Sequence, residues 1–170
     1  MARQVKVITA AEAAALIKNG DTVTTSGFVA SAIPEALDRA VEERFLATGE
    51  PRDITYVYCG SQGNKDGRGA EHFAHEGLLK RYIAGHWATV PALQKMALEN
   101  KMEAYNVSQG ALCHLFRDIA AHRPGCFTKV GLGTFIDPRN GGGKVNDVTK
   151  EDIIELVNIK GQDYLFYPAF

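Results

Sequence analysis

The residues best placed to do chemistry in this sequence lie in loops that directly follow strand-like runs. In YNVSQG, at residues 105–110, a short strand leads straight into a helix. Ser108 is a good N-cap residue, so Gln109 is expected in the first helical turn with its side-chain amide free. Unpaired backbone N–H groups and the helix dipole attract negative charge at such a place. Gln109 is therefore a candidate donor to a carboxylate or an oxyanion, although a capped helix with a solvent-facing Gln has the same sequence.

A loop of small residues, TTSGFVASAIPEAL at residues 24–37, follows an earlier strand. Gly27 lets the backbone turn tightly before Phe28, and the small side chains of residues 30–32 leave room for a ligand to approach. Because the loop holds one Gly, it is not the G-x-G-x-x-G fingerprint of dinucleotide-binding proteins. A tight crossover between two elements would need the same small residues, so both interpretations stay open.

A third loop, CGSQGN at residues 59–64, carries uncharged donors at the end of a strand. Side chains such as Ser61 and Gln62 orient a ligand without forming an ion pair with it. An ordinary solvated loop has a similar composition, so the pattern by itself is weak.

The Gly-rich segment at residues 131–147 invites comparison with a nucleotide-binding loop. Its GGGKV stretch lacks the first Gly and the Ser or Thr of G-x-x-x-x-G-K-[ST], which excludes a P-loop. We expect a flap or a loop between elements instead.

The histidines and acids give no complete catalytic or metal-binding set. His72 and His75 are three residues apart, but no third ligand is spaced to complete a metal site with them. His86, beside Trp87 after a strand, is more interesting, yet a packed structural His is the commoner case. The glutamates fall mostly on polar helix faces or at helix starts, where burial would not raise their pKa.

The expected elements position these loops. Helices are predicted after the capping-box pair Thr9 and Glu12 up to Gly20, and at residues 35–45, 71–80, 91–99 and 109–122. Strands are predicted at residues 21–25, 54–60, 82–84, 104–107 and 127–130, with a closing hairpin at 153–159 and 164–167. This alternation predicts an α/β fold with a mostly parallel sheet and helices on both faces. Ligands bind such sheets beyond the carboxyl ends of the strands.

Composition excludes several classes of protein. The chain has 170 residues, with 19 Lys and Arg against 20 Asp and Glu, a net charge of −1. This balance gives no basis for binding nucleic acid or an anionic membrane, and no apolar run approaches the roughly 20 residues of a membrane span. Three widely spaced cysteines fit neither a disulfide framework nor a zinc site, so we expect a reduced, cytoplasmic protein.

Taken together, these segments resemble the amino-terminal part of a family I coenzyme A transferase. The similarity runs through DTVTTSGFVASAIPEAL, HFAHEGLLKRYIAGHWATVPAL, YNVSQGALCHLF, GLGTFIDPRNGGGKVND and YLFYPAF, in order, over essentially all 170 residues. It is strongest to the branch of the family that acts on propionate, lactate and acetate. The resemblance implies the α/β fold of the CoA-transferase-like superfamily, and an oligomeric cytoplasmic enzyme that uses coenzyme A as a cosubstrate and no permanent cofactor or metal.

The resemblance also implies a ping-pong mechanism. A glutamate attacks the acyl-CoA thioester to give an anhydride, the CoA thiolate converts this to a glutamyl-CoA thioester, and a second carboxylate takes the CoA. The family's Gln-Gly after a strand, usually Pro-Gln-Gly, falls on Gln109-Gly110, with Ser108 in place of Pro. Gln109 would then donate to the oxyanion, a contribution of about 3 kcal/mol. The family's substrate-pocket loops fall near Ser61-Gln62, where the residue types differ, and on Gly27-Phe28.

In the family the nucleophilic glutamate lies in the second half of the polypeptide. We therefore expect residues 1–170 to be an amino-terminal domain that is incomplete at its carboxy-terminal end and inactive alone, with the remaining segment as its partner. Two alternatives stay open: a non-catalytic module that binds a carboxylate or CoA, and a sugar-phosphate isomerase of the same superfamily. The isomerase would need an acid–base pair within this chain.

Overall fold

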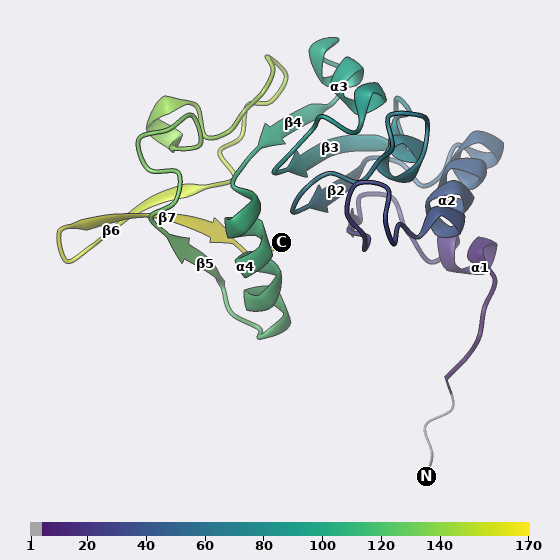
Figure 1. The fold of residues 1–170 in the computed structure, drawn as a ribbon, viewed down its shortest axis with the longest axis horizontal. Coiled ribbons are helices and arrows are strands. Elements are labelled where there is room, and N and C mark those ends of the chain that lie inside the picture. Colours follow the sequence, from purple (N-terminus) through teal and green to yellow (C-terminus); the bar gives the residue numbers. More distant parts are fainter. Residues whose placement is uncertain (1–4) are drawn as a thin grey trace.

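The computed structural model describes residues 5–170 and contains two sheets (Figure 1). The larger sheet is fully parallel, with the strand order β1-β2-β3-β4. Its strands are Thr22–Val23 (β1), Ile54–Tyr58 (β2), Leu79–Ala84 (β3) and Glu103–Asn106 (β4). The helices are Ala10–Ala14 (α1), Glu35–Thr48 (α2), Pro91–Leu98 (α3) and Gln109–Ala120 (α4), with two 3₁₀ helices at Gly69–Phe73 (η1) and Pro138–Asn140 (η2).

The second sheet is antiparallel and lies on the far side of α4, at the left of Figure 1. Its order is β5-β7-β6, made by Gly125–Thr128 (β5), Glu155–Ile159 (β6) and Gln162–Pro168 (β7). The closing hairpin predicted from the sequence is confirmed. The strand predicted at residues 127–130 lies two residues earlier, and it joins this hairpin rather than the parallel sheet.

Both faces of the parallel sheet are covered, as predicted. Alternate side chains of a strand point to opposite faces, and here Tyr82 joins the cluster under α2, η1 and α3, whereas Ile83 joins the cluster under α4. Tyr56 and Val57 divide in the same way. Because strands buried on both faces read as nearly continuous apolar runs, β2 was predicted close to its observed bounds, whereas only the second half of β3 was predicted as a strand.

Several helix and strand boundaries follow from local chemistry. Thr9 caps α1 with the predicted capping box, in which its Oγ1 accepts from Glu12 N and the Glu12 carboxylate accepts from Thr9 N. The helix nevertheless ends at Ala14 rather than reaching Gly20. Helix α2 begins directly after Pro34, as expected, and ends at Gly49 in the left-handed conformation. Val41 of α2 is buried in the core, whereas Leu37 is exposed.

The prediction of a helix at residues 71–80 is wrong. This segment forms the short 3₁₀ helix η1 and a turn, and β3 has already begun at Leu79. Gly69 and Gly77, which flank the segment, both have positive φ angles, so the chain turns at either end. Strand β1 is also shorter than predicted: it has two residues and lies half-exposed at the sheet edge.

A cluster of ionisable side chains fills the space between α2 and η1. His72 contacts two carboxylates of α2: its Nε2 lies 3.0 Å from Glu35 Oε1 and its Nδ1 lies 2.6 Å from Glu42 Oε2. His75 Nε2 also lies 2.6 Å from Glu42 Oε1. Burial opposes the charge of His72, but its bonds to Glu35 and Glu42 raise its pKa above the usual value. These ion pairs fix α2 to η1.

Asp38 lies in the same region and was missed from the sequence. Its side chain is 1% exposed, and neither carboxylate oxygen has a hydrogen-bond partner within residues 5–170. Burial raises the pKa of Asp38 to about 7, with Glu35 adding to the rise and His72 opposing it. The only sign of this in the sequence was an acid three residues before the apolar Val41, a spacing that puts both on one face of the helix.

Replacing Asp38 should therefore change stability in a pH-dependent way. The unfolded state ionises Asp38 near pH 4 and the folded state only near pH 7, so wild-type stability falls as the pH rises between these values. We expect Asp38→Asn to raise the free energy of unfolding at pH 8 by about 1–3 kcal/mol, with a smaller gain at pH 5. Urea unfolding followed by circular dichroism measures both.

The exposed Asp66 gives the matched control, since Asp66→Asn should change stability by less than about 0.5 kcal/mol at either pH. An equal effect of Asp38→Asn at pH 5 and pH 8 would show that Asp38 is ionised over the whole range.

Among residues 5–170, no helix combines the length and the apolar character needed to cross a bilayer.

Candidate functional site

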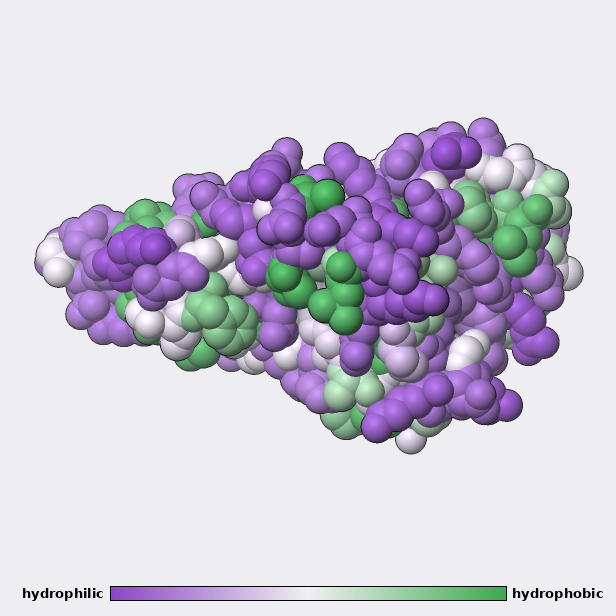
Figure 2. All heavy atoms as spheres, turned by 90° about the horizontal axis from the view of Figure 1, so that it is seen from above, coloured by the Kyte–Doolittle hydropathy of each residue, from purple (hydrophilic) through white to green (hydrophobic). Residues whose placement is uncertain are grey.

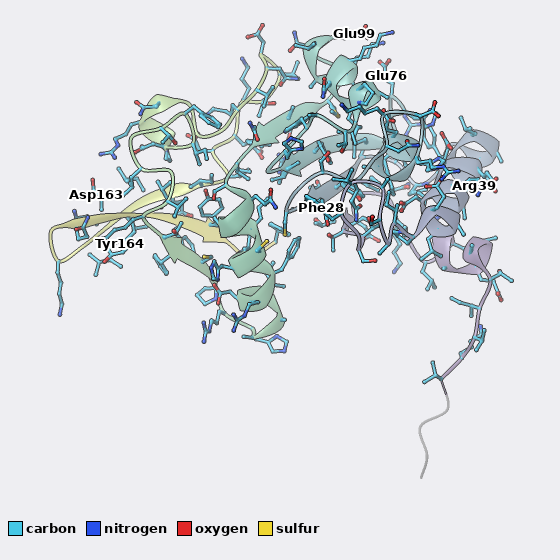
Figure 3. All side chains as sticks on the ribbon, in the orientation of Figure 1. Phe28, Arg39, Glu76, Glu99, Asp163 and Tyr164 are labelled. Carbon is cyan, nitrogen blue, oxygen red and sulfur yellow. The ribbon has the colours of Figure 1, made fainter. Side chains whose placement is uncertain are left out.

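Three loops at the carboxyl edge of the parallel sheet meet around Gly60. A Cβ atom added to Gly60 would lie 3.2 Å from the Phe28 ring and 3.6 Å from Gln109 Nε2. The loop after β1 therefore supplies Phe28, the loop after β2 supplies Gly60, and the start of α4 supplies Gln109. Figure 3 shows Phe28 near the end of β2 and α4. The structure thus brings together two of the predicted site residues, Phe28 and Gln109, at Gly60, where the absence of a side chain lets the Phe28 ring approach closely.

Gln109 lies where the sequence predicts it. It is the first residue of α4 and is exposed. Ser108 caps the helix by accepting a hydrogen bond from Ala111 N at 3.3 Å, and Val107 N donates to Ala84 O at 3.0 Å. The cap and this bond to the end of β3 hold the first turn of α4 against the sheet. The amide of Gln109 and the following Gly110 are thereby left open to a ligand.

Gly85, which the sequence analysis missed, sets how closely α4 approaches the sheet. A Cβ atom at Gly85 would lie 2.3 Å from Cys59 O and 2.7 Å from both Cα and Cβ of Gln109. No side chain fits between these atoms, so only Gly allows the loop after β2 and the start of α4 to come together here. The signal in the sequence was a single Gly after the strand that ends at Ala84.

The loop that carries Phe28 is tightly folded. Gly27 has a φ of 112°, and a Cβ atom there would lie 2.8 Å from the carbonyl oxygens of Ser31 and Ala32. Phe28 and Ser31 exchange two backbone hydrogen bonds of 2.9 Å, and Val29 N donates to Ser61 O at 2.9 Å. The loop is thus attached to the next strand end, while the Phe28 residue stays 57% exposed.

The side chains of Ser61 and Gln62 point inward. Gln62 is fully buried: its Oε1 accepts from Tyr56 Oη and Thr25 Oγ1, and its Nε2 donates to the carbonyl oxygen of Ser26. Ser61 Oγ is paired with Thr89 Oγ1. Both side chains therefore connect loops to one another, and Gln62 in particular fixes the residue directly before Gly27.

Tyr56 and Cys59 are both kept protonated at neutral pH. Burial raises the pKa of Tyr56 well above its usual value, so its hydroxyl remains a donor to Gln62. Burial, and then the neighbouring Cys113 side chain, raise the pKa of Cys59 to about 12. Because the thiolate is the nucleophilic form, Cys59 is not suited to nucleophilic catalysis at neutral pH.

Other polar groups and the Gly-rich segment have structural roles or no metal-binding arrangement. Glu71 is buried and accepts from Ala92 N at the start of α3 and from Gly67 N, both at 2.9 Å, which is a structural role. No group of three or more His, Cys, Asp and Glu within residues 5–170 is arranged to hold a metal ion. Of the two alternatives for the Gly-rich segment, the structure shows the loop between elements: it connects β5 to β6, and Asn106 N donates to Gly143 O at 2.8 Å, so part of it lies along β4.

The chain is similar in sequence to known proteins of one family. A sequence model of the family described as Coenzyme A transferase matches residues 7–170. The caffeate CoA-transferase of Acetobacterium woodii is 41% identical over 165 residues, which are 97% of this chain and 32% of that protein. One subunit of the probable succinyl-CoA:3-ketoacid coenzyme A transferase of Bacillus subtilis is 31% identical over 127 residues, which are 74% of this chain and 50% of that protein.

A solved structure is similar to this chain in both fold and sequence. The apoenzyme of the acyl-CoA transferase YdiF from Escherichia coli O157:H7 matches with a TM-score of 0.89 and 38% identity, over 98% of this chain and 32% of that chain. YdiF described as a thioester complex with CoA matches with a TM-score of 0.88 and 37% identity, over 96% of this chain and 32% of that chain. The chain thus spans about a third of the length of the caffeate CoA-transferase and of YdiF.

The contacts of Gly85 lead to a test of the site's construction. We expect Gly85→Ala to lower the free energy of unfolding by about 1–3 kcal/mol, because the added methyl group forces Cys59 and Gln109 apart. Gly110→Ala is the control: its Cβ would meet nothing closer than Ser108 Oγ at 4.0 Å, so stability should be unchanged or slightly raised.

Urea unfolding measures the energies, and the NMR shifts of the Gln109 side-chain NH₂ group report its displacement. Equal stabilities of the two variants, with unmoved Gln109 signals, would refute the close approach at Gly85.

Proposed function

Because the chain belongs to the coenzyme A transferase family, we propose that it forms the substrate-side wall of an enzyme that moves CoA from a short-chain acyl-CoA to a free carboxylate. The observation that supports this proposal most is the amide of Gln109 at the exposed start of α4, next to Gly60 and the Phe28 ring. A neutral donor at a helix start suits a group that becomes an oxyanion during the reaction.

In the proposed reaction each step creates negative charge on an acyl oxygen. A glutamate carboxylate attacks the thioester carbonyl, and CoA leaves as a thiolate to give an acyl-glutamyl anhydride. The thiolate then attacks the glutamyl carbonyl, releases the first carboxylate and leaves a glutamyl-CoA thioester. A second carboxylate reverses both steps. Gln109 Nε2 would donate to the oxygen that carries the charge, and the peptide N–H groups of the first turn of α4 would add their dipole.

The nucleophilic glutamate is proposed to come from a further segment or a partner chain. Within the described residues, the atoms nearest a Cβ placed at Gly60 or Gly85 belong to Phe28, Gln109 and Cys59, and none is a carboxylate. The whole of YdiF is about three times as long as this chain. The relative from B. subtilis is described as one subunit of its enzyme, so a second polypeptide is an equally good source of the glutamate.

Phe28 and Gly27 are proposed to define the small-acyl end of the site. The exposed ring of Phe28 gives an apolar wall next to the Gln109 amide, which would contact the methyl or ethyl group of acetate or propionate. Ser61 and Gln62, proposed from the sequence as ligand donors, would act as positioning residues instead, since their side chains are buried in the contacts between loops.

Substitution of Gln109 tests this function. In the polypeptide that carries both this chain and the nucleophile, Gln109→Ala should lower kcat/KM for exchange between propionyl-CoA and acetate by about 10²–10³-fold, as expected for one lost oxyanion donor. Gln162→Ala, at an exposed position of β7, is the control and should keep wild-type activity. Full activity of the Gln109 variant would overturn the proposed role.

The isolated 170-residue chain, assayed in parallel with the complete polypeptide, should transfer no CoA. Hydroxylamine trapping after incubation with propionyl-CoA should place the activated carboxylate outside this chain. If propionyl-CoA and acetate bind but no exchange occurs even with the complete polypeptide, the chain is part of a non-catalytic binding module.

A further inference from the structure

A pocket of about 310 Å³ lies beside the candidate site, on the α3 side of the parallel sheet. It is lined by Gly85, His86, Trp87, Gln94, Ala97, Leu98, Asn106 and Val145. Its volume is at the lower end of the range of about 300–1,000 Å³ for small-molecule sites. The proposed oxyanion donor Gln109 and the proposed small-acyl wall at Phe28 are not among these residues. Gly85 is the link, since it lines the pocket and also packs against Gln109.

The walls of this pocket are held by hydrogen bonds. The Gly-rich loop pairs with β4 through Asn106 N to Gly143 O at 2.8 Å and Val145 N to Ala104 O at 2.9 Å. The Asn146 side chain donates to Ala97 O at 2.7 Å, at the far end of α3. The loop and α3 are thus tied together across the edge of the sheet, and the space between them is formed in the folded chain.

The polarity of the lining changes along the pocket. At the carboxyl edge of the sheet, next to Gly85, it offers the polar side chains of His86 and Asn106. Farther along β4 the lining is apolar, with Leu98 at the end of α3 and Val145 opposite the beginning of the strand. These two residues are 81% and 44% exposed. Figure 2 looks down on this side of the molecule and shows apolar patches within a mostly hydrophilic surface.

We propose that this pocket binds the apolar tail of acyl groups longer than propionyl, while their carboxyl carbon lies at Gln109. The inference rests on the proposed function, since it needs the head of the substrate at that amide. Gly85 packs against Gln109 and also lines the pocket, so the pocket lies one residue away from the start of α4, and the tail would pass outside this packed contact rather than through it. A ligand with a polar head and an apolar tail matches the order of polar and apolar lining residues.

A free carboxylate and its acyl-CoA ester carry the same apolar tail, so both would place that tail in the pocket. Burial of each methylene group contributes about 0.8 kcal/mol, which corresponds to roughly a fourfold gain in affinity per carbon. Hexanoate should therefore bind markedly more tightly than propionate, whereas acetate, which ends near Phe28, should not reach the pocket.

The only Trp of the sequence, Trp87, lines this pocket and reports its occupancy. The 170-residue chain is titrated with acetate, propionate and hexanoate while the fluorescence of Trp87 is followed. Hexanoate should give a saturable blue shift or intensity change at a concentration at least tenfold below any effect of acetate. Equal effects of the three acids would overturn the proposal. So would a response to CoA alone that matches the response to hexanoyl-CoA, since that would assign the pocket to the CoA moiety.

Two valines of one loop give a matched pair of variants. Val145 lines the pocket, and Val148 is exposed to a similar extent, at 41%, but does not line it. Val145→Phe should weaken hexanoate binding at least tenfold, and Val148→Phe should leave it unchanged. Circular dichroism spectra establish that both variants fold. If the two variants bind hexanoate equally well, the tail does not lie in this pocket.

Transfer assays with the complete polypeptide separate this inference from the proposed function. Val145→Phe should lower the ratio of kcat/KM for hexanoyl-CoA to that for acetyl-CoA at least tenfold, relative to Val148→Phe. An unchanged ratio refutes the pocket and leaves the transferase function intact. Absence of transfer with every acyl-CoA, together with saturable hexanoate binding that Val145→Phe weakens, refutes the proposed function and retains the pocket as a carboxylate site.

Discussion

The close approach of two backbones at Gly85 governs the geometry of the candidate site. Parallel strands bring their carboxyl ends to one edge of a sheet, but they do not by themselves bring a helix start into contact with a neighbouring loop. At Gly85 the carbonyl of Cys59 and the Cα of Gln109 leave no room for a side chain. The position of the Gln109 amide above Gly60 follows from this contact, together with the Ser108 cap and the bond from Val107 N to Ala84 O.

The buried side-chain amide of Gln62 fixes the loop that carries Phe28. Gln62 has no exposed atoms to offer a ligand, and its three contacts, with Tyr56, Thr25 and the carbonyl of Ser26, join β2 to the loop after β1. A buried amide is costly unless its donors and acceptor are paired. The loop therefore keeps one conformation, and Phe28 is placed beside Gly60 without being buried itself.

The local features of the candidate site were predicted from the sequence, whereas several contacts between distant segments were missed. The Ser108 cap and the exposed Gln109 follow from local helix chemistry and are found in the structure. The helix predicted at residues 71–80 fails because His72 and Glu71 bond to α2 and α3 instead of lying on a helix surface. The role of Gly85 and the pairing of β5 with β7 need contacts between distant segments, which a single sequence does not reveal.

The neutral character of the proposed oxyanion donor has a chemical consequence. His72, Glu35, Glu42 and Asp38 lie between α2 and η1, whereas the donor beside Gly60 is a neutral amide. In the proposed exchange, a cation there would bind the free carboxylate and the oxyanion alike, and such uniform binding does not accelerate the chemical step. A neutral amide at a helix start binds the ground-state carboxylate less strongly, yet it donates fully to the charge that develops on the acyl oxygen. The proposed exchange forms this charge in both directions, so the same donor serves each half-reaction.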